Sequence, residues 1–82
     1  QVIERGESGA GVLWLQEALG RLGYVEVKIS GLYDEATALG VSRFQRRHAV
    51  RVDGVAGPQT QMLLYGTLDE FAPPQLEEDD AG

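Results

Sequence analysis

The sequence predicts an all-α fold: a small three-helix bundle with two repeated loop-helix units and an acidic, flexible C-terminal tail. Apolar residues recur at helical spacing in three stretches that are separated by turn residues. One pattern also occurs twice, with an apolar residue and Gln, a loop, a Gly, a helix start three residues later and a Thr three residues further on. With 82 residues and no cysteine, the chain makes one small domain without disulfides.

The repeat pairs Leu15-Gln16 with Phe44-Gln45, and the segment 31–37 with the segment 54–60. Its loops differ in length, with 14 residues between Gln16 and Gly31 and 8 between Gln45 and Gly54. A Gln at such a position more often serves the structure than a ligand. We therefore expect both amides to bridge backbone groups of the loops.

The first helix is expected to start after Ser8 as its N-cap and to end at Gly23, which suits a left-handed conformation. One face of this helix carries four apolar residues: Val12, Leu15, Leu19 and Leu22. Trp14 lies off that face and has two interpretations, a partly buried flank or a platform on which a sugar ring stacks.

Residues 24–33 alternate apolar and polar side chains like a strand, but no partner strand is evident, so an extended loop is expected. The second helix should cover about 35–48, with Asp34 as its N-cap. The third should start at Pro58, with Gly57 at the N-cap, and stop at Gly66. Gly40 either lets another segment pack closely on the second helix or weakens that helix by about 1 kcal/mol.

The charge is unevenly distributed along the chain. Residues 1–65 hold seven basic and seven acidic residues, so the net charge of -6 comes from the six acids of the tail. We expect a lead-in over 1–7, a domain over 8–66 and a partly disordered tail over 67–82. The start at Gln1, without a signal peptide or membrane-spanning stretch, suggests a fragment of a longer protein.

The sequence argues against catalysis. His48 is the only histidine, cysteine is absent, and no metal-binding spacing occurs, so we predict no catalytic residue, metal or cofactor. Asp34 and Asp53 fit capping and turn roles better than the role of a catalytic carboxylate pair. The neutral domain also disfavours nucleic acid as a partner.

An ordered set of residues over about 5–65 resembles the peptidoglycan-binding domain 1 family. The set comprises Gly9, Val12, Leu15-Gln16, Leu19, Gly23-Tyr24, Gly31, Asp34, Thr37, Val41, Phe44-Gln45, Asp53-Gly54, Gly57-Pro58, Thr60 and Leu64. Gly40, where that family tends to carry Ala, and the long first loop depart from the pattern. The resemblance implies a non-catalytic three-helix module that binds bacterial peptidoglycan and anchors a periplasmic or wall-associated parent protein.

The parent protein has two candidates. One is a cell-wall hydrolase, which is the common context of the family. The runs WLQEALGRL, FQRRHAV and DGVAGPQT also resemble the C-terminal module of secretion-pathway protein A ATPases of type II secretion, whose partners would be secretion proteins. The competing function is a protein-interaction module without wall binding, in which exposed apolar side chains such as Trp14, Leu13 or Phe71 contact a partner.

A ligand site is expected in a shallow groove beside the two repeated turns. Six residues are predicted to contribute: Trp14, Tyr33, Asp34, Arg43, Arg47 and Asp53. The two aromatic rings would stack on a glycan, the two aspartates would accept hydrogen bonds, and the arginines would contact stem-peptide carboxylates. The alternative for the arginines is a solvated face that pairs with Glu35 or with the acidic tail.

Overall fold

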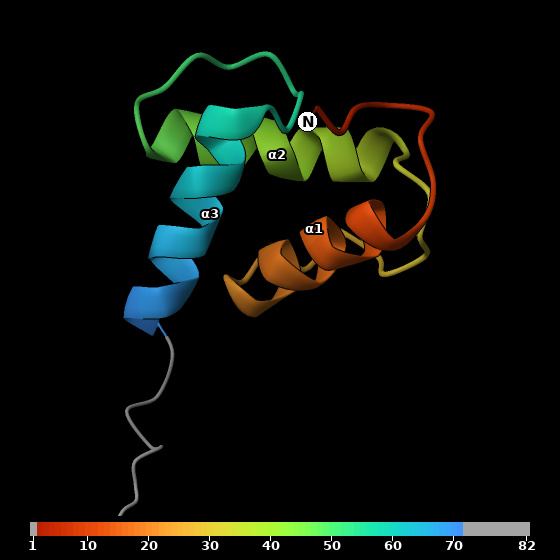
Figure 1. The fold of residues 1–82 in the computed structure, drawn as a ribbon, viewed down its shortest axis with the longest axis horizontal. Coiled ribbons are helices and arrows are strands. Elements are labelled where there is room, and N and C mark those ends of the chain that lie inside the picture. Colours follow the sequence, from red (N-terminus) through yellow and green to blue (C-terminus); the bar gives the residue numbers. More distant parts are fainter. Residues whose placement is uncertain (1, 72–82) are drawn as a thin grey trace, which may run out of the picture.

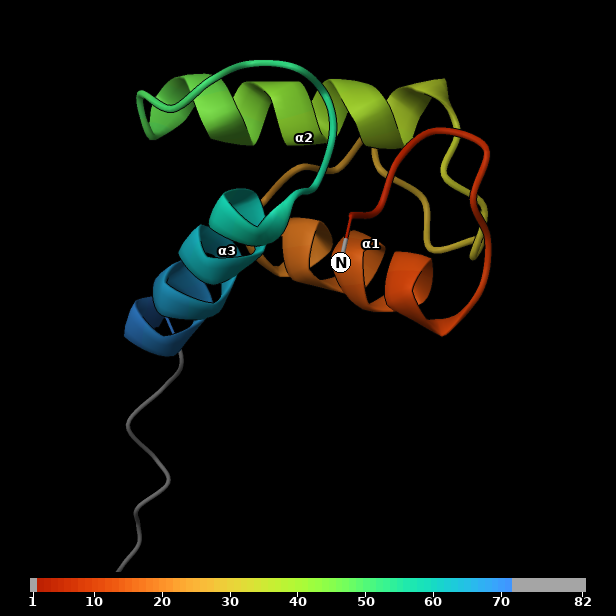
Figure 2. The same ribbon diagram turned by 45° about the horizontal axis from the view of Figure 1, so that its top comes forward.

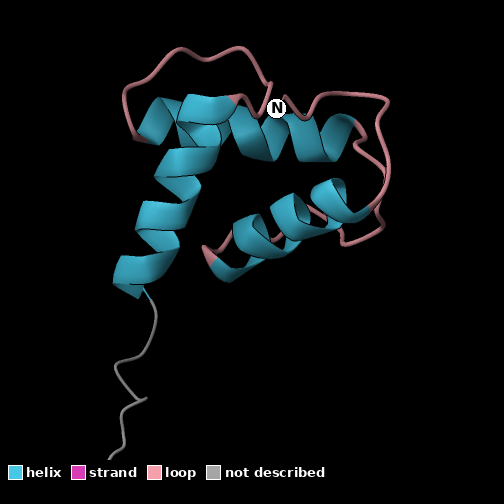
Figure 3. Ribbon diagram, in the orientation of Figure 1, coloured by secondary structure: helices cyan, strands magenta, loops and turns pink. Residues whose placement is uncertain are grey.

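The computed structural model describes residues 2–71 and contains three helices: α1 (Ala10–Arg21), α2 (Glu35–Arg47) and α3 (Pro58–Phe71). Helices α1 and α2 lie one above the other, and α3 starts near α2 and runs steeply down past one end of α1 (Figures 1 and 2). The described part contains no strand, only two isolated bridges (Figure 3). The predicted all-α class is confirmed. The expectation of a disordered tail falls largely on residues 72–82, outside the described residues.

The helix starts follow local signals, with one correction. Asp34 caps α2, because its carboxylate accepts the Thr37 backbone N–H. Helix α3 starts at Pro58 as predicted. The N-cap of α1 is Gly9 rather than Ser8, and it makes no side-chain cap hydrogen bond. Ser8 instead forms an antiparallel bridge with Leu32 in the first repeated turn. Its backbone is therefore paired with that turn, and the helix begins after Gly9.

The end of α3 also differs from the prediction, because the helix continues through Gly66 to Phe71. A glycine inside a helix costs about 1 kcal/mol relative to Ala, which contacts can offset. One such contact follows it, because Leu68 packs against the core. Tertiary packing therefore extends this helix beyond its local stop signal.

The core forms where the predicted helical faces meet. Buried side chains come from all three helices and from the segments between them: Val12, Leu15, Leu19, Val41, Phe44 and Leu64 on helices, with Ile3, Val27, Tyr33 and Ala56 outside them. The apolar face predicted for the first helix is thus confirmed, with Leu22 at its end partly buried.

The long first loop delivers one side chain to this core. Val27 is buried, whereas its neighbours in the alternating pattern, Val25 and Ile29, are 87% and 56% exposed. A Cβ atom at Gly40 would lie 2.4 Å from the Val27 Cγ2 atom, well inside contact distance. Of the two interpretations of Gly40, the structure therefore supports close packing.

Candidate functional site

The second repeated turn is held by the side-chain amide of Gln45. Its Oε1 atom accepts the backbone N–H groups of Asp53 and Gly54, both at 3.1 Å. Its Nε2 atom donates to the Val55 carbonyl at 2.9 Å and to the Thr60 hydroxyl and an Asp53 carboxylate oxygen, both at 3.0 Å. One buried amide therefore links α2 to the turn and to the first turn of α3, as the sequence predicts.

The first repeated turn is held in the same way by Gln16. Its Oε1 atom accepts the N–H groups of Ser30 at 3.0 Å and Gly31 at 2.8 Å. Its Nε2 atom donates to the Leu32 carbonyl at 2.9 Å and to the Thr37 hydroxyl at 3.0 Å. The structural role predicted for Gln16 is therefore also confirmed.

The lead-in connects the two turns. The Ile3 N–H donates to the Ala56 carbonyl at 3.0 Å, and the Ala56 N–H donates back to Ile3 at 2.8 Å. The Tyr33 N–H donates to the Glu7 carbonyl at 2.9 Å. This pairing places residues 3–7 between the repeated turns and brings the side chains of the lead-in against α2.

A pocket of about 330 Å³ lies where the lead-in, α2 and the second turn meet. Nine residues line it: Glu4, Arg5, Glu35, Ala38, Leu39, Ser42, Asp53, Gly54 and Val55. Gly54 has a φ of +72°, and a Cβ atom there would lie 3.2 Å from the Ser42 hydroxyl oxygen. The close approach of turn and helix at this point forms one end of the pocket.

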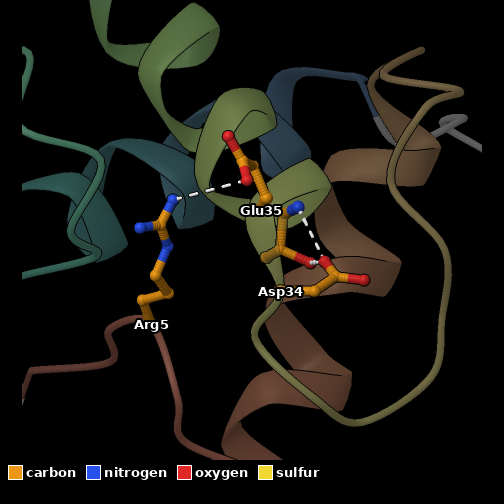
Figure 4. Close-up of polar contacts among 4 residues, drawn as sticks. Arg5, Asp34 and Glu35 are labelled. Atoms are coloured by element: carbon orange, nitrogen blue, oxygen red, sulfur yellow. Dashed lines mark hydrogen bonds and ion pairs between the residues drawn. The ribbon is translucent and has the colours of Figure 1, made fainter.

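Charged groups border this pocket. Arg5 extends from the lead-in toward Glu35 at the start of α2, and the two side chains are 3.9 Å apart (Figure 4). The carboxylate of Asp53 accepts the Val55 N–H and a Gln45 amide hydrogen, which lower its pKa below the ordinary value. Asp53 is therefore ionised at neutral pH.

Of the six predicted site residues, the structure places Asp53 in this pocket. Asp34 is turned toward its own helix (Figure 4). It accepts the Thr37 N–H at 3.0 Å and the Thr37 hydroxyl at 2.8 Å, and these bonds lower its pKa. Its capping role is established by these contacts, whereas its role as a ligand acceptor stays a prediction.

Tyr33 contradicts the expectation that its ring stacks on a ligand. The residue is 1% exposed, and its hydroxyl donates to the Gly54 carbonyl. Burial, together with the nearby Asp53 charge, raises the pKa of this phenol. Tyr33 lies under the lead-in and holds the second turn through its hydroxyl. Its ring is therefore not accessible to a ligand.

The remaining predicted residues lie elsewhere on the surface. Trp14 is partly buried, and its ring lies 4.8 Å from that of Tyr65, tilted by 32°. Arg43 pairs with Glu26 at 3.0 Å, rather than with Glu35, and the alternative of pairing with the acidic tail falls largely outside the described residues. Arg47 lines a separate hollow at the C-terminal end of α2. The structure therefore does not bring the six residues together in one groove.

The sequence did not point to the other eight lining residues, four of which have polar side chains: Glu4, Arg5, Glu35 and Ser42. One of them had a signal in the repeat. Ser42 stands three residues before Gln45, where the first copy has Leu13 three residues before Gln16. The lead-in residues had none, because their position depends on pairing with residues far along the chain.

The described residues offer neither a membrane-spanning helix nor a metal site. Among residues 2–71, none of the helices has the length and apolar character needed to cross a bilayer. The same residues contain no group of three or more His, Cys, Asp or Glu side chains arranged to hold a metal ion.

Comparisons with known proteins agree with this fold. A family model described as "Putative peptidoglycan binding domain" matches residues 8–64, more than half of the chain. The spore cortex-lytic enzyme of Bacillus cereus is 38% identical over 64 residues, covering 78% of this chain and 25% of that enzyme. The zinc D-Ala-D-Ala carboxypeptidase of Streptomyces albus G is 33% identical over 76 residues, covering 88% of this chain and 29% of that protein.

The crystal structure of the SleB N-terminal domain superposes with a TM-score of 0.78 at 36% identity, covering 82% of this chain and 92% of that one. This chain spans only about a quarter of the length of the curated relatives. The similarity is thus confined to one module of those larger proteins. The match over residues 8–64 and the shared three-helix structure show that the chain belongs to the peptidoglycan-binding domain family.

Proposed function

We propose that this module holds peptidoglycan, by its stem peptide, in the pocket between the lead-in, α2 and the second turn, and thereby anchors a parent hydrolase to the wall. The observation that carries this proposal is the composition of the pocket. Its lining combines four charged side chains with a hydroxyl and a short apolar surface, and it includes no aromatic ring. Charged and hydrogen-bonding groups suit a peptide with ionised ends, whereas stacking on sugar needs an exposed ring.

The parent protein is proposed from the relatives. The two curated proteins described above are a spore cortex-lytic enzyme and a carboxypeptidase, and each is far longer than this chain. A wall-associated or periplasmic hydrolase is therefore the proposed context. These relatives give no support to the alternative parent, a type II secretion ATPase.

The test is retention of the purified chain on purified sacculi at low and moderate salt, beside two variants. Ser42→Leu places a bulky side chain on the pocket wall and should release the chain into the supernatant. Arg43→Ala removes a cation that pairs with Glu26 elsewhere and should leave retention unchanged. If the wild-type chain stays in the supernatant at low salt, the proposal is wrong.

A protein-interaction function has one observation in its favour. Met62 and Tyr65 on α3 are 73% and 60% exposed, and Tyr65 contacts Trp14 on α1. Exposed apolar side chains that lie together often mark a protein contact. This function gains weight only if sacculi fail to retain the wild-type chain, and a Trp14→Ala variant would then test the contact.

A further inference from the structure

The pocket beside the second turn carries an imbalance of charge. Three carboxylates line it, from Glu4, Glu35 and Asp53, against the single guanidinium of Arg5. Three negative charges less one positive charge leave two uncompensated. Because the lowered pKa of Asp53 keeps that group ionised, the imbalance persists at neutral pH.

The cations outside the lining offset this excess only in part. Arg51 acts on the Asp53 carboxylate through its charge, but it contributes less to the lowered pKa than the hydrogen bonds from Val55 and Gln45 do. Arg43 pairs with Glu26 at 3.0 Å, and Arg47 borders a different hollow beside His48. The ion pair between Arg5 and Glu35 is loose, at 3.9 Å, and both side chains are more than half exposed. The pocket therefore favours a ligand that brings its own positive charge.

We propose, resting on the function proposed above, that this pocket binds the free side-chain ammonium of the diamino acid in an uncrosslinked stem peptide. The ammonium would meet the carboxylates of Glu35 and Asp53. A neighbouring ligand carboxylate would meet Arg5, whose guanidinium matches that group. The methylene chain of the diamino acid would lie on the apolar lining from Ala38 and Leu39.

This chemistry makes the module sensitive to the state of the wall. Crosslinking joins the side-chain amine to another peptide as an amide, which removes the positive charge. The excess negative charge of the pocket would then face a neutral amide, and the attraction between the carboxylates and the ammonium would be lost. The module would concentrate its parent protein where stem peptides are still free.

The test titrates the chain with a lysine-containing stem tetrapeptide, Ala-γGlu-Lys-Ala, and with the same peptide acetylated at the lysine side chain. Binding is followed by amide chemical shifts. Exposed charge pairs contribute modestly, so acetylation should weaken binding about 3- to 10-fold. Shifts for the free peptide should centre on residues that line the pocket.

Two variants assign the effect to the pocket. Glu35→Gln should reduce the preference for the free amine to about 2-fold or less. Glu17→Gln removes an equal charge from α1, away from the pocket, and should leave the preference intact. Both positions are exposed, so neither change is expected to affect folding, which circular dichroism checks.

The outcomes separate this inference from the function on which it rests. Equal affinity for the free and acetylated peptides overturns the inference, while retention on sacculi would leave the proposed function standing. Failure to bind either peptide by a chain that sacculi retain also overturns it, because the wall contact must then be glycan. Failure to be retained on sacculi overturns both.

Discussion

The two repeated turns share one supporting structure but differ at the surface. In both copies the glutamine amide donates to the equivalent carbonyl at 2.9 Å and to the equivalent threonine hydroxyl at 3.0 Å. Three residues before each glutamine, however, the first copy has Leu13 and the second has Ser42. Leu13 packs on Gly31, where a Cβ atom would lie 3.5 Å from its side chain, whereas the shorter Ser42 borders an open pocket beside Gly54. Two turns with the same internal hydrogen bonds therefore differ in whether a pocket lies beside them, because the residue three positions before the glutamine differs.

The largest effect is expected from removing either glutamine amide. Gln16→Ala and Gln45→Ala should each lower the free energy of unfolding by roughly 3–5 kcal/mol, because each leaves a cavity and several unpaired buried groups. A domain of this size has little more stability than that. Denaturation in urea measures the loss, with the exposed Gln59→Ala as control. A loss below about 1 kcal/mol in one copy would show that the two turns are not equally supported.

The next effect contrasts two glycines at equivalent positions. Gly40→Ala should destabilise the domain by about 1–3 kcal/mol, because the new methyl group overlaps Val27. Gly11→Ala should instead stabilise it by about 0.5–1 kcal/mol, since a Cβ atom there meets only Ile3 at an ordinary 3.5 Å. Thermal unfolding gives both values. The cost of Gly40→Ala should fall when it is measured in a Val27→Ala background, and an equal cost in both backgrounds would exclude the overlap as its cause.

Exchanging the residues that distinguish the copies should alter binding with little change in stability. Ser42→Leu is expected to weaken binding to soluble stem peptide about 10-fold or more, a change of about 1.4 kcal/mol. Leu13→Ser, at the equivalent place in the first copy, should leave the affinity within 2-fold. Titration calorimetry measures both. Unaltered affinity in Ser42→Leu would move the site away from the second turn.

The smallest effect concerns acid. Asp34 and Asp53 both have a pKa lowered by hydrogen bonds in the folded chain. Their contribution is complete above the unfolded value of about 4 and is lost as the pH falls through the lower folded values. Both groups are close to solvent, so the loss is on the order of 1 kcal/mol or less. Unfolding measured from pH 6 to pH 2 should show a shallower acid limb in the Asp34→Asn, Asp53→Asn double variant, and an unchanged limb would exclude these groups as its cause.

The sequence predicted what local signals control. Asp34 and Pro58 act at their own helix starts, and the two glutamines were assigned because the repeat places each at the same position before a turn. The prediction for Tyr33 was wrong because the segment that pairs with it is the lead-in, which lies far from Tyr33 in the sequence. The pocket was only partly foreseen for the same reason. Asp53 belongs to a recognisable turn, whereas Glu4 and Arg5 reach the pocket through the pairing of Ile3 with Ala56.

That pairing joins residues 53 positions apart in the chain, since 56 less 3 is 53. Contacts between residues so far apart close large loops and are slow to form, because the entropy of the loop must be overcome first. The wall of the pocket that carries Glu4 and Arg5 is thus held in place by the turn that precedes α3. A partly synthesised chain, or one trimmed at residue 8 where the family match begins, would lack the complete pocket even if its helices formed. The proposed recognition site is therefore complete only when the lead-in has paired with the second turn.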